Sequence, residues 1–292
     1  MIQHLLQLIW NQRKQNAWLW AELLLVSVFL WFLVDYLYVM GRTYTAPLGF
    51  DIRHTYSIVI SSLSERSPDY IPKEKRERPD GVHLLTALDR IRTYPGVESA
   101  CLTDGGMPYY MGSRNLVWRI DTLQVPCRYA FVTPEFFDVF RIYDKDGKTA
   151  SLKRAIEDNN SIVISADVET MNPGLSLLGQ KAYRGNVTDE IEETIRGISV
   201  PIRRHEYTKA EPNVYRALRL SRMEEGYYEG MIDAVRLCVR VRPDVDNADF
   251  PARFRKDMAE QLRLGNLYLL DVQPLSYIRD GLYPFDRRSR TR

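Results

Sequence analysis

The chain has 292 residues, 45% of them hydrophobic, so it can bury a core and we expect no large-scale disorder. Forty basic and thirty-eight acidic residues give a net charge of +2. A nucleic-acid binder would concentrate Lys and Arg on one face, and no such stripe stands out before the last six residues. We therefore expect no nucleic-acid partner.

The first strong signal is an apolar stretch at residues 17–40, which has the length of a transmembrane helix with some tilt. Its charged residues, Glu22 and Asp35, lie toward its ends, where a carboxylate reaches the interface at modest cost. A cleaved signal peptide is the weaker alternative, because the stretch is too long and no A-x-A-like site follows. Residues 1–16 place their apolar side chains mainly on one side and predict an interfacial amphipathic helix.

Two similar patterns follow, one near each end of the remaining chain. The first predicts a strand at 56–63, a helix at 82–93 that Pro95 and Gly96 stop, and a strand at 97–103. The second predicts a strand at 234–241, a helix at 250–264 capped by Asp249, and a strand at 267–272. Each is a β-α-β unit, and together they predict an α+β fold.

The order of these units predicts a ferredoxin-like split arrangement, with one antiparallel sheet and both helices on one face. The segment between the units predicts strands at 116–120, 129–133, 161–165 and 194–200, with a short helix opening at Pro134. We expect the following organisation: an amphipathic helix at 1–16, a transmembrane helix at 17–40, a split β-α-β domain at 41–103 and 231–280, an inserted β-rich subdomain at 104–230, and a basic tail at 281–292.

Candidate chemical motifs are weak. Gly105-Gly106 follows a strand, but without G-x-G-x-x-G or Gly-Lys-Ser/Thr a turn is favoured over a phosphate loop. The acidic run at 189–193 lacks the EF-hand pattern and is interpreted as a solvated loop. His205 lies in a polar stretch that favours a surface turn over a catalytic triad. We predict no catalytic, cofactor-binding or metal-binding residue, no cofactor and no enzyme activity.

Three cysteines, Cys101, Cys127 and Cys238, lie far apart in the sequence without CxxC spacing. They allow three disulfide pairings, each with one thiol left over, and buried thiols are the favoured alternative.

Five segments occur in the order found in MacB-like (FtsX-type) ABC transporter permeases. They are Pro95-Gly96-Val97-Glu98, residues 132–140 (VTPEFFDVF), residues 161–165 (SIVIS), Leu178-Gly179-Gln180-Lys181 and Ile195-Arg196-Gly197-Ile198. The chain resembles the N-terminal half of such a permease. The resemblance implies that the split domain at 41–103 and 231–280 is porter-like. In two respects the chain departs from the family: it ends at Arg292, where the family begins its second membrane helix, and Arg141 follows Phe140 directly, where the family has Gly-Arg.

The resemblance implies a permease subunit in the bacterial inner membrane, with its large domain outside, that transmits motion driven by a separate cytoplasmic ABC ATPase. It implies a homodimer or pairing with a related permease, and an envelope partner protein. Numbers of flanking Lys and Arg are tied, so charge alone leaves the orientation open. The alternative is a single-span envelope sensor or scaffold.

Overall fold

The computed structural model describes residues 10, 17–110, 112, 114–185 and 190–282. The chain divides into two compact units, Met1–Ala46 with Glu206–Thr208, and Pro47–His205 with Lys209–Arg292. Apart from Trp10, the predicted amphipathic helix at 1–16 lies outside the described residues, and so does the basic tail beyond residue 282.

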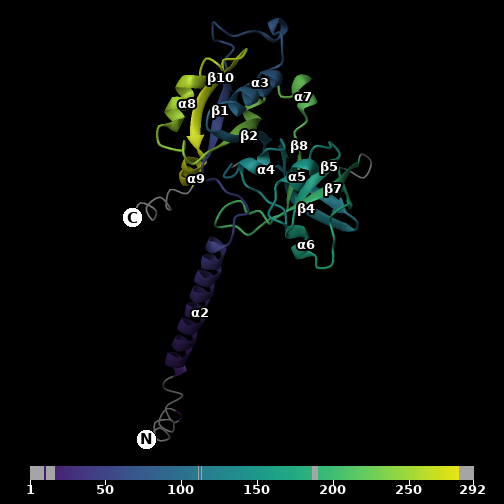
Figure 1. The fold of residues 1–292 in the computed structure, drawn as a ribbon. Helices are drawn as coiled ribbons and strands as arrows, with labels where there is room; N and C mark the ends of the chain where they lie inside the picture. Colours follow the sequence, from purple (N-terminus) through teal and green to yellow (C-terminus); the bar gives the residue numbers. More distant parts are fainter. Residues whose placement is uncertain (1–9, 11–16, 111, 113, 186–189, 283–292) are drawn as a thin grey trace. The chain divides into compact units, whose positions relative to one another are not determined.

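The first unit contains helix α2, Ala17–Thr45, which is the one described helix long and apolar enough to cross a membrane (Figure 1). None of its described side chains is buried. The helix extends five residues beyond the predicted end at Met40, since Pro47 is the first residue that cannot continue it. Thr45 Oγ1 donates a hydrogen bond to the carbonyl of Gly41 at 3.0 Å in this last turn.

The second unit contains both predicted β-α-β segments. Their elements are β1 (Thr55–Ser62), α3 (Asp80–Arg92), β2 (Val97–Asp104), β9 (Val235–Val241), α8 (Phe250–Met258) and β10 (Leu267–Pro274). The four strands lie in the order β10-β1-β9-β2, and every neighbouring pair is antiparallel. The prediction that these strands share one sheet is confirmed.

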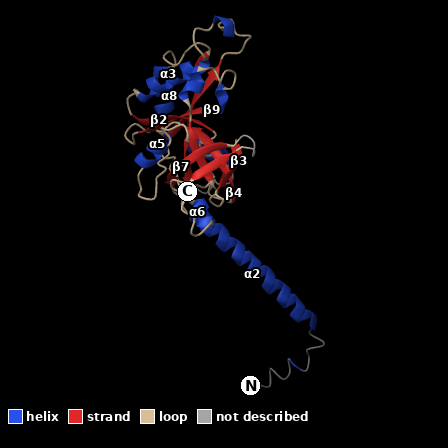
Figure 2. Ribbon diagram, turned by 90° about the vertical axis from the view of Figure 1, so that its right-hand side faces the viewer, coloured by secondary structure: helices blue, strands red, loops and turns tan. Residues whose placement is uncertain are grey.

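One face of this sheet is covered by both helices (Figure 2). Helix α3 buries Leu84, Leu88 and Ile91, and helix α8 buries Phe250, Phe254 and Met258. These side chains form one cluster with alternate residues of the four strands. The periodic apolar positions of the sequence are thus the contact faces, because residues three or four apart lie on one side of a helix.

The remaining strands close into a barrel, which the sequence did not predict. They are β3 (Arg114–Ile120), β4 (Leu123–Val132), β5 (Ser161–Ser165), β6 (Lys181–Arg184), β7 (Ile191–Ser199) and β8 (Asn213–Ala217). The order β4-β3-β6-β7-β5-β8 closes because β8 also pairs in parallel with β4. Strand β2 pairs with β4, so the sheet is continuous from the first four strands into the barrel.

The other helices of the described residues are short. They are α4 (Phe136–Val139), α5 (Ala150–Ala155), α6 (Asp167–Met171), α7 (Leu220–Glu224), α9 (Leu275–Leu282), η1 (Lys73–Lys75) and η2 (Ile232–Ala234). The predicted helix opening at Pro134 corresponds to α4. The prediction of mixed α and β content with one N-terminal apolar helix is therefore confirmed. The closed barrel differs from the expected architecture.

Two local predictions about helix α8 were wrong. Asp249 lies at the N-cap position but makes no side-chain capping bond, since its φ and ψ are already helical. The regular helix ends at Met258 and not near residue 264, because Leu264 forms a β-bridge with Leu267 across a tight turn. Gly265 has φ +57° in that turn, and a Cβ there would lie 2.7 Å from His83 Nε2.

The three cysteines are free and buried in the structure. Cys101 of β2 stands directly opposite Cys238 of β9, and both belong to one cluster on the sheet face opposite α3 and α8. Cys127 belongs to a separate cluster in the barrel, and burial raises the pKa of its thiol to about 12. Opposed residues of antiparallel strands have Cβ atoms about 4.5–5.5 Å apart, close to disulfide geometry.

We expect refolding in a glutathione redox buffer to link Cys101 with Cys238 and to leave Cys127 reduced, because only the first two thiols share a register position. Peptide mapping of alkylated protein checks the pairing, with Cys127→Ser as the control that leaves the disulfide in place. A mapped disulfide that includes Cys127 would contradict the prediction.

Candidate functional site

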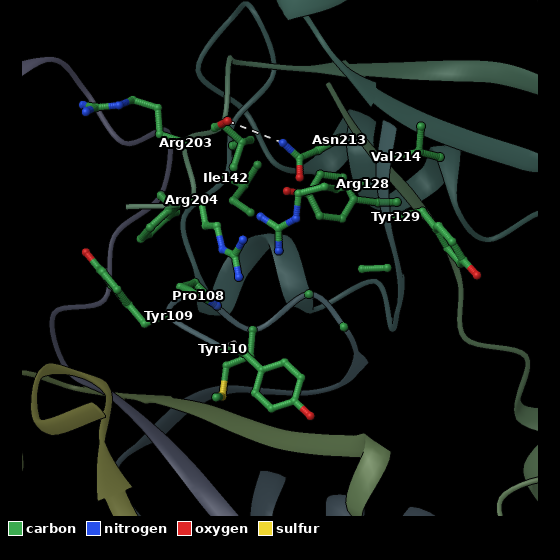
Figure 3. Close-up of a pocket in the computed structure, with 17 residues that line it drawn as sticks. Pro108, Tyr109, Tyr110, Arg128, Tyr129, Ile142, Arg203, Arg204, Asn213 and Val214 are labelled. Atoms are coloured by element: carbon green, nitrogen blue, oxygen red, sulfur yellow. Dashed lines mark hydrogen bonds between the residues drawn. The ribbon is translucent and has the colours of Figure 1, made fainter. Parts of the chain in front are cut away.

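A small pocket lies where strand β2 leads into the loop at residues 105–110 (Figure 3). Its other walls come from β4, from β8 and from the loop at residues 201–204. Its volume is about 40 Å³, which is room for water molecules but not for an organic ligand.

The loop that forms one wall is built around two glycines. Gly105 has φ +84°, and the Gly106 amide donates a hydrogen bond to Thr103 Oγ1 at 3.1 Å. A Cβ on Gly106 would lie 2.5 Å from the same Oγ1. The geometry fits the turn favoured from the sequence, and the Gly106 amide is already used within the protein, so it is not presented to a phosphate.

Two guanidinium groups meet in this pocket. In Figure 3 the side chains of Arg128 and Arg204 converge, whereas Arg203 extends away from them. Burial, and then the charge of Arg204, lower the pKa of Arg128. The Arg128 Nε atom is buried without a hydrogen-bond partner in the described structure. The pocket is therefore a small site lined on its polar side by arginine and Asn213.

Asn213 holds the far wall in place. Its Nδ2 donates hydrogen bonds to the carbonyls of Glu211, at 2.6 Å, and Ile202, at 3.4 Å, and the second of these is drawn in Figure 3. Its backbone amide donates to Ser165 Oγ at 2.9 Å. These bonds fix the 201–204 loop against strands β5 and β8, so the wall that presents Arg204 is rigidly supported.

The acidic run is not simply the predicted solvated loop, although Asp189 lies outside the described residues. Glu192 and Glu193 belong to β7, and successive strand residues point to opposite faces. Glu192 faces solvent and pairs with Lys181, whereas the Glu193 side chain is 2% exposed and pairs with Arg216 at 2.5 Å. The sequence carried no signal for this, because Arg216 is distant along the chain.

Chemically, the described residues offer binding groups and no recognisable reaction centre. Nowhere in the described part of the chain do three or more His, Cys, Asp or Glu side chains gather to hold a metal ion. His205 belongs to the second unit and makes at least one interaction of its own. The prediction of no catalytic, cofactor-binding or metal-binding residue stays a prediction.

Comparison with known proteins gives a fold relationship. No protein-family model and no curated protein sequence matches the chain. Among solved structures, a domain of a putative permease protein from Porphyromonas gingivalis matches with a TM-score of 0.51 and 19% identity, covering 78% of this chain and 92% of that one. The chain thus has the fold of a permease domain, and the expected resemblance is confirmed at the level of the fold.

Two further structures are similar at lower TM-scores. The periplasmic region of MacB from Actinobacillus actinomycetemcomitans matches at 0.44, with 10% identity over 82% of this chain and 97% of that one. The extracellular domain of the noncanonic ABC-type transporter YknZ from Gram-positive bacteria matches at 0.41, with 11% identity over 74% of this chain and 100% of that one.

Proposed function

We propose that the chain is the extracytoplasmic and first-helix part of an ABC transporter permease subunit, which transmits ATPase-driven motion across the membrane. The observation that carries the proposal is the order of its parts. An apolar helix of 29 residues precedes a folded unit whose fold matches a permease domain over 78% of this chain.

Transmission of motion requires that the segment leading into β1 be firmly attached to the folded unit. The Asp51 amide donates a hydrogen bond to the Phe140 carbonyl at 2.8 Å, and the buried Arg240 donates to the carbonyls of Asp51 and Arg53. The segment that enters β1 is therefore bonded to the packed body of its own unit. A packed, hydrogen-bonded body is suited to moving as one piece when its entering segment is displaced.

We assign the parts as the sequence predicts: a membrane helix at 17–40, a split porter-like domain at 41–103 and 231–280, and an inserted β-rich subdomain at 104–230. The order β10-β1-β9-β2 with antiparallel neighbours supports a ferredoxin-like split β-α-β arrangement for the first domain. The barrel strands, which all fall between residues 114 and 217, support the second.

In this proposal ATP hydrolysis belongs to a separate cytoplasmic ABC ATPase, and this part of the chain is not an enzyme. A homodimer or a related permease completes the transporter, an envelope protein is the outer partner, and the bacterial inner membrane is the location. A single-span sensor or scaffold is the alternative. Co-purification of an ABC ATPase with the chain from its native membrane supports the transporter, and its absence supports the alternative.

The topology of the chain provides the direct test. We expect an impermeant thiol reagent on intact cells to modify a cysteine at Lys73 and to spare one at Gln12, in variants that lack Cys101, Cys127 and Cys238. Lys73 is exposed in the folded unit, and large domains are exported largely regardless of flanking charge. Labelling after permeabilisation is the control for reactivity at both sites. The reverse pattern would leave only a cytoplasmic scaffold.

A further inference from the structure

A second cavity, of about 220 Å³, is lined by arginine to an unusual degree. Five arginines contribute, and they come from β3, β6, β8 and the segment that contains α7: Arg114, Arg184, Arg216, Arg219 and Arg222. Asp104 is the one acidic lining residue, and Glu193 lies behind the wall in contact with two of the arginines. Five positive charges therefore face two negative ones.

The two carboxylates are already engaged. Asp104 pairs with Arg114 at 2.9 Å, and Glu193 pairs with Arg216 at 2.5 Å and with Arg184 at 3.3 Å. The Arg184 contact is ionic but not a well-directed hydrogen bond, because its Nε has no hydrogen-bond partner in the described structure. Within the protein these pairs stabilise three of the arginines and leave no carboxylate for the others.

The other two arginines contribute two of the three surplus positive charges. Arg219 Nη2 donates a hydrogen bond to the Asn159 carbonyl at 3.3 Å, and the Arg222 guanidinium lies 5.0 Å from the centre of the Tyr227 ring. Among the described residues, neither has a carboxylate within ion-pair distance. Both side chains belong to partly exposed residues at the cavity, where an incoming anion can reach them.

Aromatic rings complete the walls. Arg216 lies 4.9 Å from the centre of the Phe131 ring, and Tyr129, Tyr227 and Tyr228 also line the cavity. A ring face holds a guanidinium in place without using its N–H groups. Arg216 already donates to Glu193, whereas Arg222, over the Tyr227 ring, has no carboxylate partner among the described residues. Such donors match the oxygens of phosphate groups in paired hydrogen bonds.

We propose that this cavity binds a ligand through a phosphate group. Like charges gathered in a partly buried space repel one another, so an anion with several oxygens offsets a cost that the folded chain carries. The cavity volume fits a phosphate-bearing group and not a large organic molecule, since pockets for drug-sized ligands have volumes of roughly 300–1,000 Å³. The ligand is a soluble phosphate ester or a phospholipid head group, which share this chemistry, and the site is independent of the proposed transport function.

Isothermal titration of the full chain in non-ionic detergent at low ionic strength tests the proposal. Pyrophosphate is the soluble probe, and dihexanoyl phosphatidic acid is the lipid probe. We expect at least one to bind with a dissociation constant below about 1 mM, and R219A/R222A to weaken it at least about tenfold, since charge-assisted hydrogen bonds are lost. The probe that binds more tightly identifies the source of the phosphate.

The matched control is R255A/R263A, which removes two exposed arginines outside the cavity and changes the net charge equally. We expect less than about a twofold change there, because screened surface charges act weakly at a distance. Should R219A/R222A not fold, R222Q replaces it, with a loss of at least about threefold expected from one charge-assisted contact.

Four results would overturn the proposal. They are no saturation by either probe, unchanged affinity in the cavity variants, an equal loss in the control, and tighter binding of a hexa-aspartate peptide than of both phosphate probes. The last result would assign the cavity to an acidic segment of a protein partner.

Discussion

Replacing Arg240 with methionine is expected to lower the free energy of unfolding by about 3 kcal/mol or more, since each buried polar group left unsatisfied costs roughly 1–3 kcal/mol. Arg240 is fully buried, and its three guanidinium nitrogens donate hydrogen bonds to the carbonyls of Val139, Arg53 and Asp51, each at 2.7 Å. The substitution removes all three donors. Burial lowers the pKa of Arg240, but these bonds are what retain the group inside the fold.

Chemical denaturation of the full chain, followed by near-ultraviolet circular dichroism, measures this loss. Arg242 is the matched control, because it is two residues further along, it is exposed, and Asp244 is its one ion-pair partner among the described residues. We expect R242M to change stability by less than about 0.5 kcal/mol, as is usual for surface positions. The stability of R240K should lie between those of the wild type and R240M, since an ammonium group cannot reach all three carbonyls. Stability of R240M equal to that of the wild type would contradict the argument.

Removing the charge of Glu193, which is buried in the barrel, should lower the free energy of unfolding about as much as R240M does. We expect E193Q to cost about 3–5 kcal/mol, the range for breaking a buried ion pair and leaving its partner uncompensated. The Glu193 side chain is 2% exposed, and it contacts Arg216 and Arg184 while accepting a hydrogen bond from Trp118 Nε1 at 3.3 Å. Two partly buried guanidinium groups would lose their only acidic contact among the described residues.

Trp118 makes the effect visible by fluorescence. The other four tryptophans, Trp10, Trp18, Trp20 and Trp31, lie in the first 31 residues, so replacing them with phenylalanine leaves a single reporter next to Glu193. We expect E193Q to shift the emission of this reporter as well as to lower stability.

The matched control for E193Q is E192Q in the same strand, whose exposed carboxylate pairs with Lys181 and should change stability far less than E193Q does, because solvent screens this pair. Coupling is the second check. The stability lost by E193Q combined with R216M should be smaller than the sum of the two single losses, because one of the two uncompensated guanidinium groups is gone. Additive costs would show that the pair does not act as a unit.

Much of the fold could be predicted from local sequence patterns. The apolar stretch at 17–40, the strand at 161–165 and the periodic residues of helices α3 and α8 were all predictable. In each case the signal lies within one element, because a helix or strand that buries one face must repeat its apolar residues at the period of its own backbone. The ordered motifs also indicated the permease-type fold.

Other features of the protein are determined only by the tertiary structure, because they depend on residues far apart in the chain. Strand β8 has no signal of its own for pairing with both β4 and β5, so barrel closure could not be predicted. The opposition of Cys101 and Cys238 follows from the register between β2 and β9. The burial of Glu193 follows from its place inside the barrel, and the arginine cavity gathers side chains from β3, β6, β8 and the segment around α7. Periodicity tells which face of an element is buried, but only the packing of distant elements determines which side chains meet there.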